Sequence, residues 1–72
     1  DRLIGCIGTV SSAVIPTSHE KRIGQANVLD STRNLVIINA VLPEWATVIP
    51  RLGEKVLVID RQAQNYIVIA KD

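Results

Sequence analysis

Short apolar runs separated by polar, turn-forming residues follow one another along the whole chain. Runs of this kind that are rich in Val and Ile and bounded by Gly, Pro, Asn or Asp are typical of β-strands. The apolar residues are almost all Val, Ile, Leu and Ala, and β-branched side chains pack well on pleated sheets. The pattern predicts five strands, at residues 3–15, 21–29, 35–42, 55–60 and 66–70.

The polar segments 30–34 and 61–65 join the second expected strand to the third and the fourth to the fifth, as hairpin turns do. Five short strands with these two hairpins predict an all-β fold, a small five-stranded barrel like the oligonucleotide-binding (OB) fold, with little or no helix. An SH3-like barrel is the nearest competitor. The 72 residues form one domain, and no repeat or linker divides them.

Small residues concentrate in the first two expected strands. Glycine inside a strand usually marks a bend or a close approach of two backbones, so Gly5 and Gly8 predict a first strand that curves to serve both halves of the barrel. We expect Gly24 and Ala26 of the second strand to lie beneath these two glycines. Gly53 fits the turn before the fourth strand.

The third expected strand is apolar almost throughout, which predicts burial on both faces or one face covered by a loop or another molecule. Val36 and Ile38 are therefore candidate contacts for a partner. The loop that follows, 43–50, is bracketed by two prolines and carries Trp45, the single tryptophan. We expect Trp45 to cap an open end of the barrel, with a role as a partner contact as the alternative.

Composition limits the function further. The net charge is +1 with both signs mixed along the chain, so the basic patch typical of nucleic-acid modules is missing. Single-stranded nucleic acid is nevertheless the second candidate ligand, because OB barrels bind it by stacking bases on aromatic side chains, for which only Trp45 and Tyr66 are available. No apolar run approaches the length of a membrane span. The chain starts at Asp1 and contains no methionine, so we expect it to be a piece of a longer protein.

No residue pattern supports catalysis, and no cofactor or metal is expected. The lone His19 stands in a polar loop without the three or four ligands that a metal needs. Cys6 lies within the first expected strand and is interpreted as a small packing residue. The serines lack the surroundings of a hydrolase nucleophile, and no phosphate-binding glycine loop is present.

Three glycine-bearing segments, the L-x-G-x-x-G of residues 3–8, the G-x-A-x-V of 24–28 and the L-G-E-K-V-x-V of 52–58, resemble the C-terminal domain of the NfeD-like family, including its YqiJ-type relatives. The resemblance implies an OB-type barrel that is the soluble domain of a multi-pass membrane protein, on the cytoplasmic side. It also implies a non-catalytic assembly role with flotillin- or stomatin-like scaffold proteins. Self-association is a further option for so small a domain. Arg33 and Asn34 stand where a glycine-bearing turn is more usual in that family.

Overall fold

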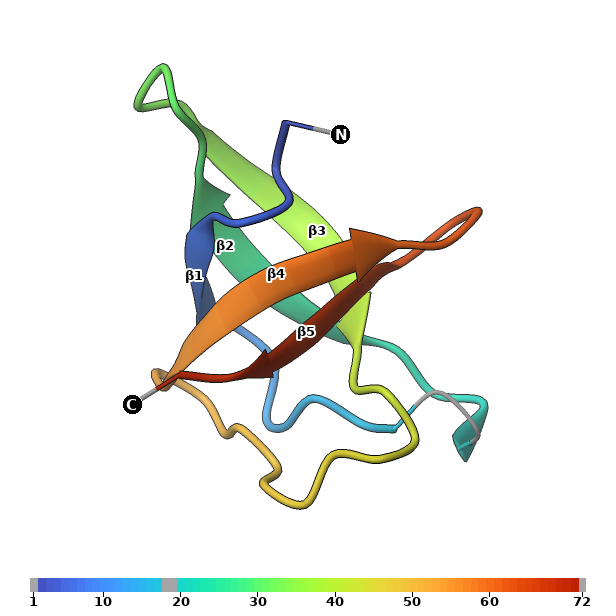
Figure 1. Ribbon diagram of the computed structural model, residues 1–72. Helices are drawn as coiled ribbons and strands as arrows, with labels where there is room; N and C mark the ends of the chain where they lie inside the picture. Colours follow the sequence, from blue (N-terminus) through green and yellow to red (C-terminus); the bar gives the residue numbers. More distant parts are fainter. Residues whose placement is uncertain (1, 18–19, 72) are drawn as a thin grey trace.

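A computed structural model describes residues 2–17 and 20–71 of the chain, which fold into five strands that close into a barrel (Figure 1). The strands are β1 (Ile7–Val10), β2 (Gly24–Leu29), β3 (Leu35–Val41), β4 (Lys55–Arg61) and β5 (Tyr66–Ala70). Their order around the barrel is β1-β2-β3-β5-β4, and β4 closes the ring by pairing with β1. All pairs are antiparallel except β3 with β5. The predicted all-β, OB-like barrel is thus confirmed.

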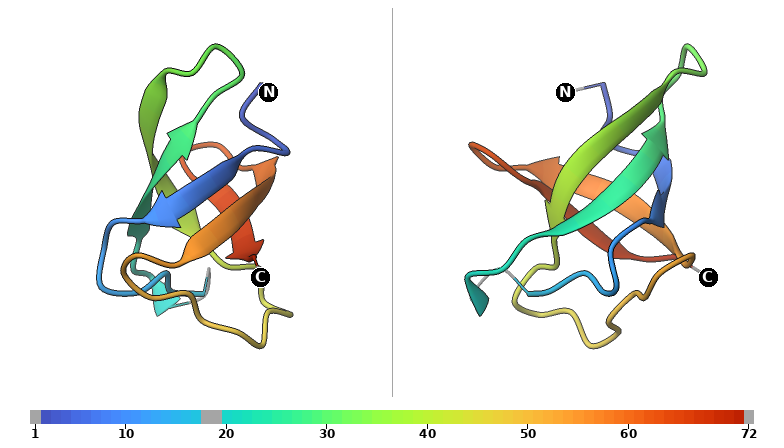
Figure 2. Two further views of the ribbon diagram at one scale, coloured as in Figure 1. Left: turned by 90° about the vertical axis from the view of Figure 1, so that its left-hand side faces the viewer. Right: turned by 180° about the vertical axis from the view of Figure 1, so that it is seen from behind.

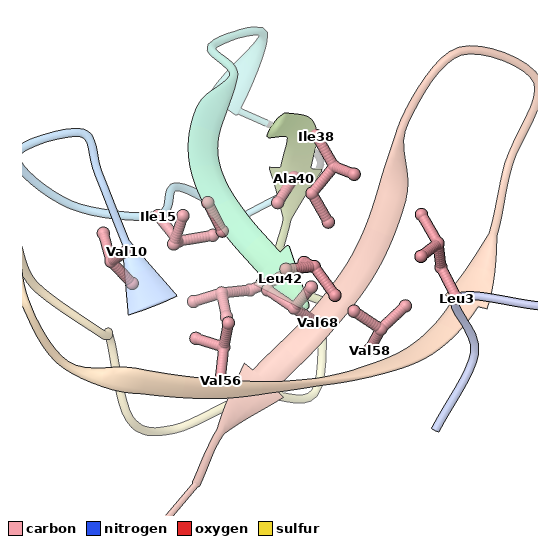
Figure 3. Packing of buried hydrophobic residues seen from close by; sticks show 11 residues of the cluster. Leu3, Val10, Ile15, Ile38, Ala40, Leu42, Val56, Val58 and Val68 are labelled. Atoms are coloured by element: carbon pink, nitrogen blue, oxygen red, sulfur yellow. The ribbon is translucent and has the colours of Figure 1, made fainter. Parts of the chain in front are cut away.

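The core is built by alternation along most of the strand residues, although Ala40 and Val41 of β3 and Ile67 and Val68 of β5 are consecutive buried residues. In β2, side chains alternate between buried and outward-facing positions from Gly24 to Leu29, as a pleated strand with one face inside a barrel requires. The core cluster fills the barrel from Leu3 at one end to Val10 and Ile15 at the other (Figure 3). Its members are small or β-branched, which suits the narrow interior of a five-stranded ring: Leu3, Val10, Ile15, Ala26, Val28, Ile38, Ala40, Leu42, Val56, Val58 and Val68.

The first strand is much shorter than the predicted segment 3–15. Gly5 precedes β1 in a turn with φ of +91°, a conformation that L side chains rarely adopt, so the chain only straightens after Cys6. Beyond Val10 the chain turns again at Ser12, whose hydroxyl donates to the Val14 carbonyl at 2.9 Å and accepts the Gln25 N–H at 3.0 Å. The expectation of one long curved strand is therefore wrong.

The predicted stacking of the small residues is also wrong. Gly8 pairs with Val28 of β2 and lies close to the carbonyl of Asn27 on the same strand. Gly24, by contrast, lies against Val14 and Ile15. A Cβ atom on Gly24 would stand 2.8 Å from Ile15 Cδ1 and 2.9 Å from the Val14 carbonyl oxygen. The two glycines thus allow two separate close approaches, one at Gly24 where β2 begins and one beside Val28 near its end.

The long connections gather at one end of the barrel, opposite the tip of the β2–β3 hairpin (Figure 2). Main-chain hydrogen bonds hold them together: the Ile15 N–H donates to the Pro50 carbonyl, and the Leu42 N–H donates to the Pro16 carbonyl. Loop 43–50 contains a turn closed by the Ala46 N–H on the Pro43 carbonyl. Across residues 2–17 and 20–71, no helix is long and apolar enough to cross a membrane.

Candidate functional site

Trp45 does not cap the barrel, contrary to the prediction. Its side chain is 69% exposed, whereas Ile15, Leu42 and Pro50 are completely or almost completely buried. Trp45 is therefore available at the surface.

Two shallow grooves flank the Trp45 ring. One has a volume of 220 Å³, which is below the range of about 300–1,000 Å³ that small-molecule sites occupy, and it runs past Val48, Ile69 and Ala70. The other, of 330 Å³, passes Glu44, Ile59, Asp60 and Ile67 on the outer side of β4 and β5. Trp45 therefore separates a mainly apolar groove from a groove that is lined by the carboxylates of Glu44 and Asp60.

The third strand is buried on one face only. Ile38 is 4% exposed and belongs to the core, and Val36 is half-buried and packs against it, so the two predicted contact residues point into the barrel. The neighbouring Leu35 and Ile37 are 65% and 68% exposed. Of the two alternatives for this strand, burial on both faces is wrong, and coverage of one face by another molecule stays a prediction. The choice of Ile38 as a contact is wrong, because side chains alternate along a strand and Leu35 and Ile37 are the ones that face outward.

These exposed side chains belong to an apolar stripe on the outer face of the barrel. The register sets Leu57 beside Ile7 and Leu29 beside Leu35, and Ile37 follows one step along β3. A shallow groove of 560 Å³ runs along the stripe, with Thr9, Asn27 and Lys55 on its polar side. Sequence reasoning missed this stripe. It follows only when two things are known: which alternate residues of each strand face outward, and which of them the pairing register places side by side.

The tip of the β2–β3 hairpin is fixed by one carboxylate. Asp30 Oδ1 accepts hydrogen bonds from the Thr32 hydroxyl at 2.7 Å and from the Thr32 and Asn34 N–H groups at 2.9 Å each. These bonds, led by the one from the Thr32 hydroxyl, lower the pKa of Asp30 below its ordinary value because they favour the charged form. Arg33 completes the turn with φ of +66°, where glycine or asparagine is usual.

β3 and β5 touch only briefly and then diverge (Figures 1 and 2). Their pairing consists of Ala40 with Tyr66 and Val41 with Ile67, whereas β3 pairs with β2 along six consecutive residues. A fourth groove, of 400 Å³, occupies the opening between the two strands and is lined by Arg2, Leu3, Val36, Arg61 and Tyr66. The Arg61 guanidinium lies over the Tyr66 ring, 5.5 Å from its centroid.

The other candidate groups offer little chemistry. Cys6 is half-buried, packs against the core and approaches the Arg2 carbonyl at 3.6 Å. His19 lies outside the described residues. Within residues 2–17 and 20–71, no group of three or more His, Cys, Asp or Glu side chains is placed to hold a metal ion.

Comparisons with family models, with curated proteins and with solved structures found no match for this chain.

Proposed function

We propose that the chain is a non-catalytic, soluble interaction domain of an NfeD-like multi-pass membrane protein, and that it assembles with a flotillin- or stomatin-like scaffold protein on the cytoplasmic side. The family and the kind of partner come from the resemblance of segments 3–8, 24–28 and 52–58. The interaction role has independent support in the surface of the barrel.

The observation that carries the proposal is the grouping of exposed apolar side chains. Single exposed hydrophobic residues are normal on protein surfaces, but contiguous groups with a polar border mark interaction sites. Leu29, Leu35 and Ile37 are each at least 51% exposed and lie on adjacent strands, and Trp45 and Val48 form a second group on loop 43–50. Tryptophan is also among the residues most enriched in interface hot spots.

Binding to a purified flotillin-like protein tests the proposal. We expect Leu35→Ser or Trp45→Ser to weaken binding while the far-ultraviolet circular dichroism of the domain stays unchanged, because both side chains are exposed. Ile23→Ser is the matched control, since Ile23 is 54% exposed and lines none of the grooves described above. Equal binding by all three variants and the parent chain would remove the apolar surfaces from the account.

The competing hypothesis, a single-stranded nucleic-acid module, finds less support. Trp45 and Tyr66 line different grooves, and Arg61 covers one face of the Tyr66 ring, so they do not form a shared stacking platform. Phosphate contacts are strongest at low salt. A titration with single-stranded oligonucleotides at low salt should therefore show no binding, and tight, salt-sensitive binding would favour the competing hypothesis.

A further inference from the structure

An anchored turn presents Glu44 and Trp45 at the surface of the barrel. The Ala46 N–H donates to the Pro43 carbonyl at 3.1 Å, which makes Glu44 and Trp45 the two central residues of the turn. Ala46 is half-buried and packs against the core cluster, so the turn is held against the barrel. Trp45 itself is 69% exposed. Its ring therefore faces solvent from a backbone that the core holds in place.

A bulge in β4 brings a second carboxylate to the same surface. Val56 and Val58 are buried, and strict alternation would place the side chain of Asp60 on that core face. The register with β5 shifts between Val58 and Asp60, so Ile59 is an extra residue in the ladder. Ile59 and Asp60 consequently both line the 330 Å³ groove beside Trp45, on the outer side of the barrel.

The groove carries charge of one sign. Its charged lining residues in the described part of the chain are Glu44 and Asp60. Glu44 forms no hydrogen bond or ion pair with any other residue in the ranges 2–17 and 20–71. Asp60 Oδ1 accepts the Arg61 N–H at 2.7 Å, and its Oδ2 atom has no partner in the same ranges. The Arg61 guanidinium lies over the Tyr66 ring and lines the groove between β3 and β5 instead.

These charges select the ligand of the surface. Two carboxylates repel the phosphates of nucleic acids and of anionic lipid headgroups. A second copy bound through the same surface would bring four carboxylates together, which disfavours it as well. A cation is favoured twice, because the carboxylates attract it and the face of an exposed indole ring binds it. Arginine fits best, since its planar guanidinium stacks on aromatic rings and donates to carboxylates through several N–H groups.

We propose that Trp45, Glu44 and Asp60 bind an arginine side chain on an extended segment of a protein partner. The guanidinium stacks on the indole ring and donates hydrogen bonds to the two carboxylates. Residues two positions apart on an extended segment point the same way, about 7 Å from each other. An apolar side chain at that spacing enters the 220 Å³ groove of Val48 and Ile69 on the other side of the ring. This inference rests on the proposed interaction function and assigns its binding site and the chemistry of its ligand.

Fluorescence of Trp45, the single tryptophan of the chain, measures this binding directly. The probe is a synthetic peptide of about eight residues that carries leucine and arginine two positions apart in a serine–glycine background. Titration of the peptide into the whole 72-residue chain should change the emission of Trp45 in a saturable manner, because the guanidinium covers the exposed ring. An emission that does not change would overturn the proposal.

Three control peptides separate charge from shape. Citrulline has the shape of arginine without its charge, and a citrulline peptide should bind about tenfold more weakly. Glutamate in place of arginine should abolish binding, because it places like charges beside Glu44 and Asp60. Serine in place of leucine should weaken binding about tenfold through the loss of apolar contact. Equal affinity for the arginine and citrulline peptides would overturn the proposal.

Variants of the two carboxylates test the same site. Glu44→Gln and Asp60→Asn keep the size of each side chain and remove its charge, and each should weaken binding of the arginine peptide about threefold. Asp60→Asn also keeps the acceptor for the Arg61 N–H. Glu54→Gln is the matched control, because Glu54 is exposed, lines none of the grooves described above and accepts the Arg51 N–H, as glutamine can also do. Equal weakening by Glu54→Gln would show that only the net charge matters and would overturn the site.

The outcomes also distinguish this inference from the proposed function. Binding of a flotillin-like protein that is lost in Trp45→Ser but kept when Glu44→Gln and Asp60→Asn are combined would overturn the arginine site and leave the interaction role standing. Peptide binding with the expected variant profile, but no binding of the flotillin-like protein, would support the site and overturn that partner. Association of the chain in analytical ultracentrifugation that Arg33→Gln abolishes would show that a second copy supplies the arginine and would overturn the proposal.

Discussion

Replacing Gly24 by alanine tests the packing of the irregular segment 11–17 against the barrel. The added methyl group would stand 2.8 Å from Ile15 Cδ1, 2.9 Å from the Val14 carbonyl oxygen and 3.1 Å from Ile15 Cα. Two of these three atoms belong to the backbone, and the Ile15 N–H is itself bonded to the Pro50 carbonyl at 3.0 Å. The methyl group can therefore be accommodated only by moving the chain at residues 14–15 away from β2.

Overpacking of this kind costs about 1–3 kcal/mol, and the reduced freedom of the unfolded chain returns about 0.4–1 kcal/mol. We expect Gly24→Ala to lower the free energy of unfolding by about 1–2 kcal/mol, which corresponds to a fall in Tm of about 4–16 °C for a domain of this size.

Circular dichroism is the appropriate probe of this unfolding, because Trp45 is largely exposed in the folded state and its fluorescence would report unfolding poorly. Gln25→Ala, at the exposed neighbouring position of β2, is the matched control and should stay within about 0.5 kcal/mol of the parent chain. A Gly24→Ala variant as stable as the control, or more stable, would show that residues 14–15 do not lie against β2.

Three further predictions concern the first strand and the β2–β3 hairpin. Gly8→Val should lower the free energy of unfolding by more than about 1 kcal/mol in urea titrations, because its Cβ would lie 2.9 Å from Val28 Cγ2; an unchanged midpoint would place β1 elsewhere. Since the pKa of Asp30 is lowered in the folded chain, stability should fall as the pH drops below 3.8, and Asp30→Asn should flatten that part of the profile; parallel profiles would contradict the hydrogen-bond assignment. Arg33→Gly should raise Tm slightly, because φ of +66° costs a non-glycine residue about 1 kcal/mol; a lower Tm would contradict the strained turn.

The strands from β2 to β5 were predictable because their signals are local. Alternation and flanking turn residues place the expected segment 66–70 on the observed β5, and 55–60 within one residue of β4. The first strand was not predictable in the same way, since Gly5 and Gly8 look alike in the sequence. One glycine supplies a positive φ and the other a close approach, and only the folded chain separates these two roles.

The candidate site was harder to predict than the fold, because it depends on non-local geometry. The sequence identifies β3 as unusually apolar. Whether Ile37 or Ile38 is exposed, however, depends on which set of alternate side chains faces out of the barrel. Likewise, a tryptophan between two prolines is compatible with either a buried or an exposed ring until the volume beneath it is known. Asp60 faces outward beside Trp45 because a bulge shifts the register of β4 after Val58, which no local pattern records.

Amide hydrogen exchange along β3 in the unliganded chain tests the central claim, a barrel whose register turns the side chains of Leu35 and Ile37 outward, most directly. Hydrogen-bonded and non-hydrogen-bonded pairs alternate in an antiparallel ladder. The account therefore predicts slow exchange at Val36 and Ile38, which bond to β2, and fast exchange at Ile37, whose N–H points into the opening between β3 and β5. Equally slow exchange at all three amides would show that another strand covers this edge of β3. Fast exchange at Val36 and Ile38 with protection of Ile37 would show that the register is shifted by one residue.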